Sequence, residues 1–237
     1  MKRNALFATT AAALLLAACG TAETQDTEAP EAALETVEAV QAELVDLSEV
    51  NSGAYSLERT HAFLTWKVGH SGGISDYTVQ FGDFGAELVF DSADPTASTL
   101  IATVNPASLI VNYPGDYKAG HADSGFETWA EDMARNERWL NADNFPEIMF
   151  TSTNVALTGA DTGTVTGDLS FLGVSQPVTL DVTYNGNANA PWFGERDLIG
   201  FNATTTINRS DFGMTAAIPN ISDAVTIEFS GEFLQDE

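Results

Sequence analysis

The chain has 237 residues, with 34 Asp and Glu against 9 Lys and Arg, which gives a formal net charge of −25. A chain this acidic repels polyanions and lacks the basic face that DNA and RNA binding need, so we expect no nucleic-acid partner. Hydrophobic residues make up 44% of the chain, enough for a core, and the length suits a single all-β domain.

The first residues have the layout of a secretory signal. Lys2 and Arg3 precede an apolar run over 11–18 that is too short to span a membrane as a helix. Leu16-Ala17-Ala18-Cys19 resembles the lipobox of bacterial lipoproteins, whose cysteine is acylated and becomes the new N-terminus. Cys19 is the only cysteine. We therefore predict a signal peptide over 1–19 and lipid attachment at Cys19; an ordinary signal peptide is the alternative.

This anchor predicts a location in the cell envelope, on the periplasmic side of a membrane. Gly20 differs from the aspartate that retains many lipoproteins at the inner membrane, which favours the outer membrane.

Residues 20–52 are acidic and rich in Ala, Glu and Thr, which predicts a disordered tether between the anchor and the domain. Some apolar residues recur at helical spacing and could form a short amphipathic helix: Leu34, Val37, Val40, Leu44 and Leu47. We assign 53–237 to one domain because no Pro/Gly-rich linker divides it.

The domain opens with a clear strand pattern. Between His61 and His70, apolar residues alternate with polar ones, which predicts a strand with one buried face. The same period of two returns in the segments 86–90, 100–104, 165–171, 178–184 and 225–229. Many such strands need a shared interior. We therefore predict an antiparallel β-barrel of about eight to ten strands.

One region interrupts the alternation, from Asn112 to Pro146. Phe126, Trp129 and Met133 recur there every three or four residues, which predicts a helix over 126–139. We expect this helical insertion to pack across or beside the sheet.

Several motifs resemble the YceI-like family over about residues 54–235, in the order in which the family has them. The most characteristic is Thr166-Gly167-Asp168-Leu169-Ser170-Phe171-Leu172-Gly173-Val174, followed by residues 176–182. Further similar stretches are residues 206–214, 61–70, 81–84, 145–146 and 150–153.

The resemblance implies a lipocalin-like barrel outside the cytoplasm, with a long-chain isoprenoid or similar amphiphile in a central tunnel. It implies a binding or carrier protein without a cofactor, not an enzyme. The chain departs from the family at Val79-Gln80-Phe81, where Gly-x-Phe is common. Glu137-Arg138-Trp139-Leu140 also replaces an Arg-Asp…His-Leu segment. The resemblance therefore defines the fold of this chain but not its tunnel mouth or its ligand headgroup.

The predicted ligand-binding residues are those of the apolar strand faces together with three polar or turn positions. They are Leu64, Trp66, Val68, His70, Phe81, Leu88, Phe90, Phe150, Leu169, Phe171, Leu180, Phe201, Ala203, Arg209, Phe212, Ile227 and Phe229. An eight-stranded barrel is just wide enough for such side chains either to line a tunnel or to fill a core, so both remain open.

The polar candidates have more than one interpretation. His61 and His70 differ in parity and lie roughly 30 Å apart on a straight strand, so they cannot share a metal and we predict no metal site. His70 is either a rim histidine or a contact to the ligand headgroup. Arg209, on the inward parity, either pairs with Asp211 or contacts the headgroup.

No sequence of the nucleophile-elbow type is present, so no catalytic residue is predicted. Binding of a long-chain amphiphile is the leading hypothesis. The alternatives are an enzyme or redox accessory with His70 or Asp211 as proton carrier, and a closed structural barrel. The sequence does not indicate an oligomeric state.

Overall fold

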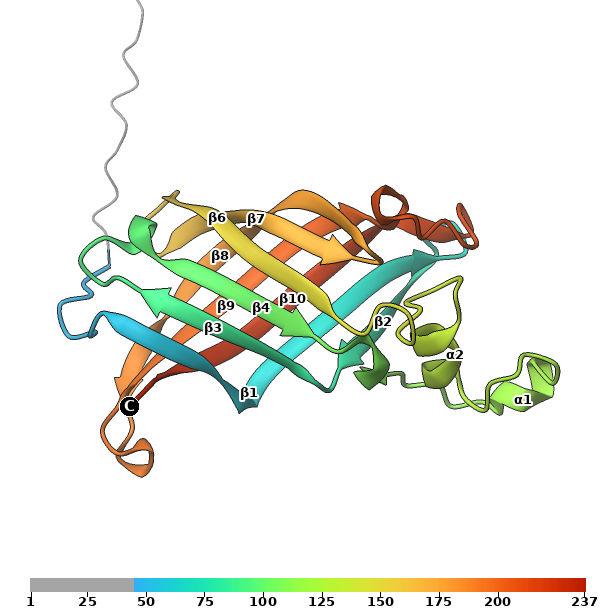
Figure 1. Cartoon of the computed structure of the whole chain (residues 1–237), viewed down its shortest axis with the longest axis horizontal. Coiled ribbons are helices and arrows are strands. Elements are labelled where there is room, and N and C mark those ends of the chain that lie inside the picture. Colours follow the sequence, from blue (N-terminus) through green and yellow to red (C-terminus); the bar gives the residue numbers. More distant parts are fainter. Residues whose placement is uncertain (1–44) are drawn as a thin grey trace, which may run out of the picture. The chain divides into compact units, whose positions relative to one another are not determined.

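A computed structural model describes residues 45–237 (Figure 1). Its strands are β1 (Gly53–His70), β2 (Ser75–Phe81), β3 (Phe84–Phe90), β4 (Thr99–Val104), β5 (Leu109–Ile110), β6 (Ile148–Leu157), β7 (Thr162–Phe171), β8 (Val174–Asn189), β9 (Asp197–Asn208) and β10 (Ile221–Gln235). The α-helices are α1 (Tyr117–Gly120) and α2 (Trp129–Arg135), and the 3-10 turns are η1 (Pro95–Ala97), η2 (Pro106–Ser108), η3 (Pro191–Phe193) and η4 (Arg209–Phe212). Within these residues, no helix combines the length and apolar character needed to cross a membrane.

The strands form one antiparallel sheet that closes on itself. Its order is β10-β9-β8-β7-β6-β4-β3-β1-β2-β5, and β1 also pairs with β10. Eight strands therefore close the barrel, while β2 and β5 extend it at one end (Figure 1). Long β1 pairs with β3 along its first residues and with β2 along its last. The predicted all-β antiparallel barrel is confirmed.

The strand register explains how the alternating pattern makes an interior. Leu64 lies opposite Phe229, Phe229 lies opposite Ala203, and Ala203 lies opposite Val182. Since directly opposed residues point to the same side of a sheet, these four side chains form one row inside the barrel. Their chain neighbours, such as Glu228 and Thr204, point outward.

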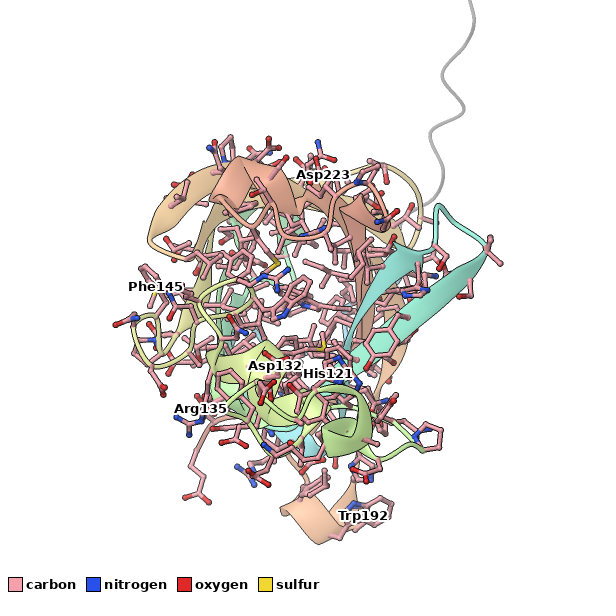
Figure 2. The ribbon with its side chains drawn as sticks, turned by 90° about the vertical axis from the view of Figure 1, so that its right-hand side faces the viewer. His121, Asp132, Arg135, Phe145, Trp192 and Asp223 are labelled. Atoms are coloured by element: carbon pink, nitrogen blue, oxygen red, sulfur yellow. The ribbon has the colours of Figure 1, made fainter. Side chains whose placement is uncertain are left out.

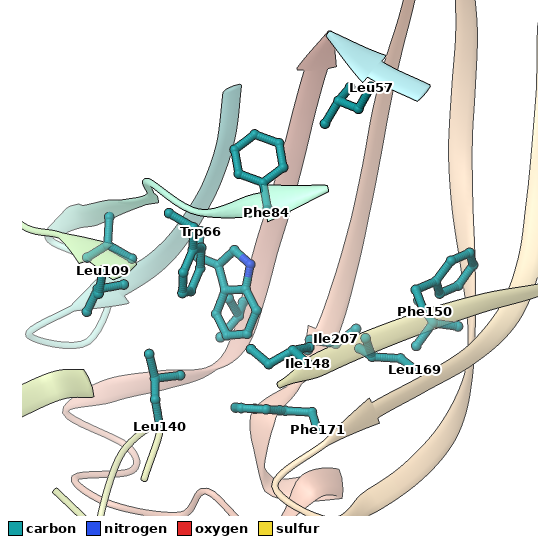
Figure 3. Close-up of a cluster of buried hydrophobic side chains, with 14 of the residues drawn as sticks. Leu57, Trp66, Phe84, Leu109, Leu140, Ile148, Phe150, Leu169, Phe171 and Ile207 are labelled. Carbon is teal, nitrogen blue, oxygen red and sulfur yellow. The ribbon is translucent and has the colours of Figure 1, made fainter. Parts of the chain in front are cut away.

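Aromatic side chains fill one end of this interior. The Trp66 ring centroid lies 5.1 Å from that of Phe81 and 5.5 Å from that of Phe171, both edge to face. Phe171 in turn lies 5.6 Å from Phe212. Figure 3 shows Trp66 and Phe171 together with Ile148, and with Leu140 from the segment that follows α2. This end of the barrel is a packed core.

The predicted helical insertion is present but much shorter than 126–139. Helix α2 begins after Thr128, whose hydroxyl accepts the Glu131 amide at 3.1 Å, and ends before Asn136. Asn136 is extended, and its backbone amide donates to the Asp132 carbonyl at 2.9 Å, which closes the last turn and ends the helix. The helix is therefore limited by the Thr128 side-chain cap at its start and by the extended Asn136 at its end. Figure 2 views the barrel from this end, with the helical segment in the foreground.

The ordered domain begins earlier than the predicted boundary at residue 53. Val50 is only 4% exposed, and the Val45 amide donates to the carbonyl of Ala160 at 3.0 Å. The Asn51 amide and side chain both donate to Asp197, at 2.7 and 2.9 Å. Residues 45–52 therefore pack on the barrel instead of belonging to a free tether.

Leu47 lies in this segment without helical structure. The predicted signal peptide over 1–19, the attachment site Cys19 and residues 20–44 of the predicted tether lie outside the described residues.

Candidate functional site: an apolar cavity inside the barrel

The unfilled part of the barrel holds a cavity of about 610 Å³. All eight strands of the closed barrel contribute to its wall, because each turns one face inward. The strand side chains that line it are mainly apolar and include Leu57, Leu64, Leu88, Leu100, Phe150, Val165, Leu180, Val182, Phe201, Ala203, Ile227 and Phe229.

The burial pattern shows that this space is open. Leu64, Leu180, Phe201, Ile227 and Phe229 point into the barrel, yet each is only partly buried. Toward the packed end, by contrast, Phe171 is 1% exposed. Apolar side chains on an inward face keep solvent-accessible surface only if the interior is hollow beside them. The barrel is therefore filled at one end and hollow at the other.

The cavity has a mouth at the end of the barrel away from α2. The mouth is formed by residues 45–48, by the β3–β4 loop with Ser92 and Pro95, and by the β6–β7 loop with Ala160 and Asp161. The deep end lies against Trp66, Ile148 and Leu169, beyond which the aromatic core begins. The site is thus a pocket that is closed at one end, whereas the family resemblance implied a central tunnel.

Most of the predicted ligand-binding residues line this pocket. They are Leu64, Trp66, Leu88, Phe90, Phe150, Leu169, Leu180, Phe201, Ala203, Ile227 and Phe229. The remaining predicted residues do not line it: Val68, His70, Phe81, Phe171, Arg209 and Phe212. Phe81, Phe171 and Phe212 belong to the packed end, and Val68 packs against the same core. Strand parity fixed the face of each side chain but not its depth along the barrel.

His70 lies at the far end of β1, exposed, with its Nδ1 2.9 Å from the Ser71 hydroxyl. It is placed at a barrel rim, as one of its two interpretations required, but at the packed end. It is remote from the cavity mouth, so the structure does not place it beside a headgroup held there.

Arg209 has a different environment from the predicted ion pair with Asp211. It lies in η4, is 3% exposed, and donates to the carbonyls of Ser222 at 2.9 Å, Met214 at 3.1 Å and Ile221 at 3.0 Å. Burial lowers the pKa of its guanidinium. The ion pair with Asp211 is wrong, because backbone carbonyls of the following turn satisfy the charge.

The carboxylate whose charge acts on Arg209 is that of Asp223. It accepts the amide and the hydroxyl of Ser210 at 2.8 and 2.6 Å. These hydrogen bonds, and more weakly the charge of Arg209, lower the pKa of Asp223. Arg209 and Asp223 together fix the turn at the packed end and take no part in the cavity.

His61 lies on the outer face of β1 beside two carboxylates. Its Nδ1 is 2.6 Å from Glu58 Oε2 and 3.7 Å from Glu232 Oε2, and Glu58 and Glu232 face each other across the β1–β10 pair. Although burial of Glu58 opposes it, hydrogen bonds from Thr60 and His61 lower the pKa of this carboxyl. The imidazole of His61 thus lies between two carboxylates that oppose each other across the strand pair, on the outside of the barrel and away from the cavity.

Some cavity residues were missed by sequence reasoning. Val182 and Tyr184 share the parity of Leu180, so the signal for them was present in the alternation. The Tyr184 hydroxyl donates to Asn187 at 2.9 Å, and burial raises its pKa. Val45 and Leu47 precede the first strand in an acidic stretch that the sequence assigned to a tether. Leu47 shared a helical spacing with earlier apolar residues, which gave no indication that it lines a cavity.

Comparison with known proteins agrees with this architecture. The family model of the YceI-like domain matches residues 55–233. The chain belongs to the YceI-like family. The resemblance seen in the sequence is therefore confirmed over almost the whole barrel.

Curated relatives of this YceI-like chain include two proteins named UPF0312. That of Pseudomonas putida strain GB-1 is 38% identical over 173 residues, covering 72% of this chain and 81% of the relative. That of Pseudomonas fluorescens strain SBW25 is 35% identical over 196 residues, covering 82% and 93%.

Solved structures show the same fold. Burkholderia cenocepacia BcnA is 20% identical with a TM-score of 0.60, covering 76% of this chain and 99% of BcnA. The Campylobacter jejuni YCEI protein is 24% identical with a TM-score of 0.57, covering 69% and 88%. These likenesses establish the barrel of the YceI-like domain; its cavity is described from this chain's own side chains.

Proposed function

We propose that this YceI-like protein binds a long-chain amphiphile, with the chain in the cavity and the polar head at the mouth. The observation that carries the proposal is the apolar cavity of about 610 Å³, a size typical of ligand pockets. A cavity with such walls offers no hydrogen-bonding partners to water along most of its length, so it suits an alkyl or isoprenoid chain.

Burial of successive methylenes supplies the affinity. At about 0.8 kcal/mol per methylene, ten buried groups contribute about 8 kcal/mol before the cost of ordering the ligand is subtracted. This driving force depends on length and hardly on chemical detail. We therefore propose that the cavity accepts ligands with either an isoprenoid or a fatty-acyl chain, and that the polar head is recognised only at the mouth.

Two alternatives from the sequence find less support. A structural barrel with a filled interior would leave no cavity of this size. An enzyme acting on the chain would need proton carriers beside it, and neither His70 nor Asp211 lines the cavity.

We also propose that the protein acts in the cell envelope as a lipid-anchored carrier on the periplasmic side, with the outer membrane favoured. Support for this part comes from the lipobox-like Leu16-Ala17-Ala18-Cys19 and from Cys19 being the sole cysteine.

The decisive experiment is native mass spectrometry of the protein purified from its host, followed by lipid extraction. We expect a complex with one amphiphile per barrel, released on denaturation. Protein that carries no lipid and takes up none from a host lipid extract would refute the proposal.

A further inference from the structure

The charged side chains that line the cavity are all acidic. Among its lining residues, only Asp46 and Asp161 carry a formal charge at neutral pH, and both lie at the mouth. Within residues 45–237, no Lys, Arg or His lines the cavity. An occupant's head therefore meets carboxylates and no cationic side chain.

Backbone hydrogen bonds hold in place the two segments that carry these carboxylates. The hydrogen bond from the Val45 amide to the Ala160 carbonyl, 3.0 Å long, joins the two segments that carry them. Hydrogen bonding from Ser48, whose amide lies 2.9 Å from Asp46 Oδ1, lowers the pKa of Asp46 and keeps it ionised. The Asp161 carbonyl accepts the Tyr184 amide at 2.7 Å, which ties that loop to the barrel wall.

The adjoining β3–β4 loop adds to this acidity. Asp91 and Asp94 flank lining residues Ser92 and Ala93. Their carboxylates accept backbone amides of the same loop, so they are fixed beside the mouth.

Cationic side chains of the barrel are engaged elsewhere. Four form ion pairs on the surface: Arg59 with Asp83, Lys67 with Glu228, Lys118 with Glu127, and Arg135 with Asp143. Arg209 is buried in its ring of carbonyls. Arg196 donates to the carbonyls of Phe193 and Gln235. None of them is directed to the cavity.

We infer that the cavity selects amphiphiles with a cationic head, such as an alkyl ammonium, and discriminates against fatty acids and alkyl phosphates. This inference rests on the proposed function, since it requires that the chain enters the cavity. An ammonium at the mouth is attracted by Asp46 and Asp161. An anionic head is repelled by both and finds no counter-charge.

The test is a titration calorimetry series with three ligands that share one chain: dodecyltrimethylammonium, dodecanol and dodecanoate, each below its aggregation concentration. We expect the ammonium to bind tightest and the carboxylate weakest. One unit charge about 4 Å from another in water changes affinity by roughly fivefold, so two carboxylates give a preference of up to about 25-fold over the alcohol. The preference should shrink at high salt because the mouth is exposed.

The variant Asp46→Asn/Asp161→Asn should remove most of the affinity difference between ammonium and carboxylate, and should change dodecanol affinity much less than that of either charged ligand. Asp123→Asn is the matched control, because Asp123 is an exposed carboxylate in the segment after α1, at the opposite end of the barrel. It should leave all three affinities as in the wild type.

The outcomes separate the two proposals. If no ligand binds, the proposed function fails. If all three bind equally, or dodecanoate binds tightest, the proposed function stands and the cationic selectivity is refuted. A preference for the ammonium that survives in the double variant would also overturn the assignment to these carboxylates.

Discussion

Replacing Ala203 with Trp distinguishes a hollow barrel from a packed one. Ala203 points into the barrel from the middle of β9, opposite Phe229 and Val182, and lines the cavity. An indole at this position extends into the unfilled space. Filling a cavity stabilises proteins by about 0.5–2 kcal/mol, whereas overpacking a filled core costs about 1–3 kcal/mol. The sign of the stability change therefore reports on the interior.

The effect on binding has the opposite sign. If the indole displaces four methylenes of a bound chain, at about 0.8 kcal/mol each, affinity falls by about 3 kcal/mol, or more than a hundredfold. For a domain of this size, a gain of about 1 kcal/mol raises Tm by roughly 2–4 °C. We therefore expect a delipidated Ala203→Trp protein that melts at or slightly above the wild-type temperature and binds dodecanol far more weakly.

Two controls complete the assay, which combines thermal melting with dodecanol titration. Ala134→Trp inserts the same side chain into the filled end, where Ala134 is 3% exposed, and should lower Tm markedly. Asn202→Trp places it on the outer face of the same strand and should change neither quantity. A sharply lowered Tm for Ala203→Trp, or a stable Ala203→Trp protein with wild-type affinity, would refute the reasoning.

Three further predictions concern the packed end and the N-terminus. Arg209→Met should cost about 3–5 kcal/mol in urea unfolding, because three carbonyls at the packed end lose the donor of a buried guanidinium. Arg138→Met, at an exposed position, should change the unfolding free energy little, and similar losses for both variants would contradict this. The pKa of Asp223 is lower in the folded than in the unfolded protein, so its ionised carboxylate stabilises the fold above about pH 4 and this stabilisation is lost as pH falls through the folded pKa. Asp223→Asn should therefore weaken the fall of unfolding free energy with decreasing pH. Cys19→Ser should yield protein without acyl mass, and an unmodified Cys19 in mature native protein, seen by intact mass, would defeat the anchor prediction.

The sequence predicted the barrel because each strand repeats the same local signal. A period of two identifies the buried face of β1 or β9 without any knowledge of its partners. It could not tell that Leu64 faces a cavity while Val68, four residues along the same face, packs against the aromatic core. That difference depends on Phe171, which packs on Trp66, and on Phe212, which packs on Phe171; these contacts form only once the barrel has closed.

Polar contacts were the hardest to predict for a related reason. Arg209 was expected to pair with a nearby carboxylate, but it donates to the backbone carbonyls of Met214, Ile221 and Ser222. Every residue has a backbone carbonyl, so the sequence does not indicate which ones will accept a hydrogen bond. The length of α2 was overestimated because apolar spacing suggested a longer helix than the capping residues Thr128 and Asn136 allow.

The start of the domain offers a test of what residues 45–52 contribute. In the structure Val50 is buried, and Asn51 supplies two hydrogen bonds to Asp197, which is itself only 6% exposed. The Tyr55 hydroxyl also donates to the Asn51 carbonyl at 2.6 Å. A chain that begins at residue 53, where the sequence placed the boundary, lacks all of these contacts and leaves Asp197 with the weak Tyr55 contact at 3.4 Å.

We expect this shorter chain to be less stable than one that begins at residue 45. Burial of Val50 contributes about 1.5–3 kcal/mol at most. A buried carboxylate that loses its donors costs about 1–3 kcal/mol or more. The difference in unfolding free energy from urea titration should thus be about 3–6 kcal/mol, and Asn51→Ala in the longer chain should show only a fraction of it. Because residues 45–48 also line the mouth, the shorter chain should release dodecanol faster. Two chains with the same urea midpoint would show that this segment only lies on the barrel and does not stabilise it.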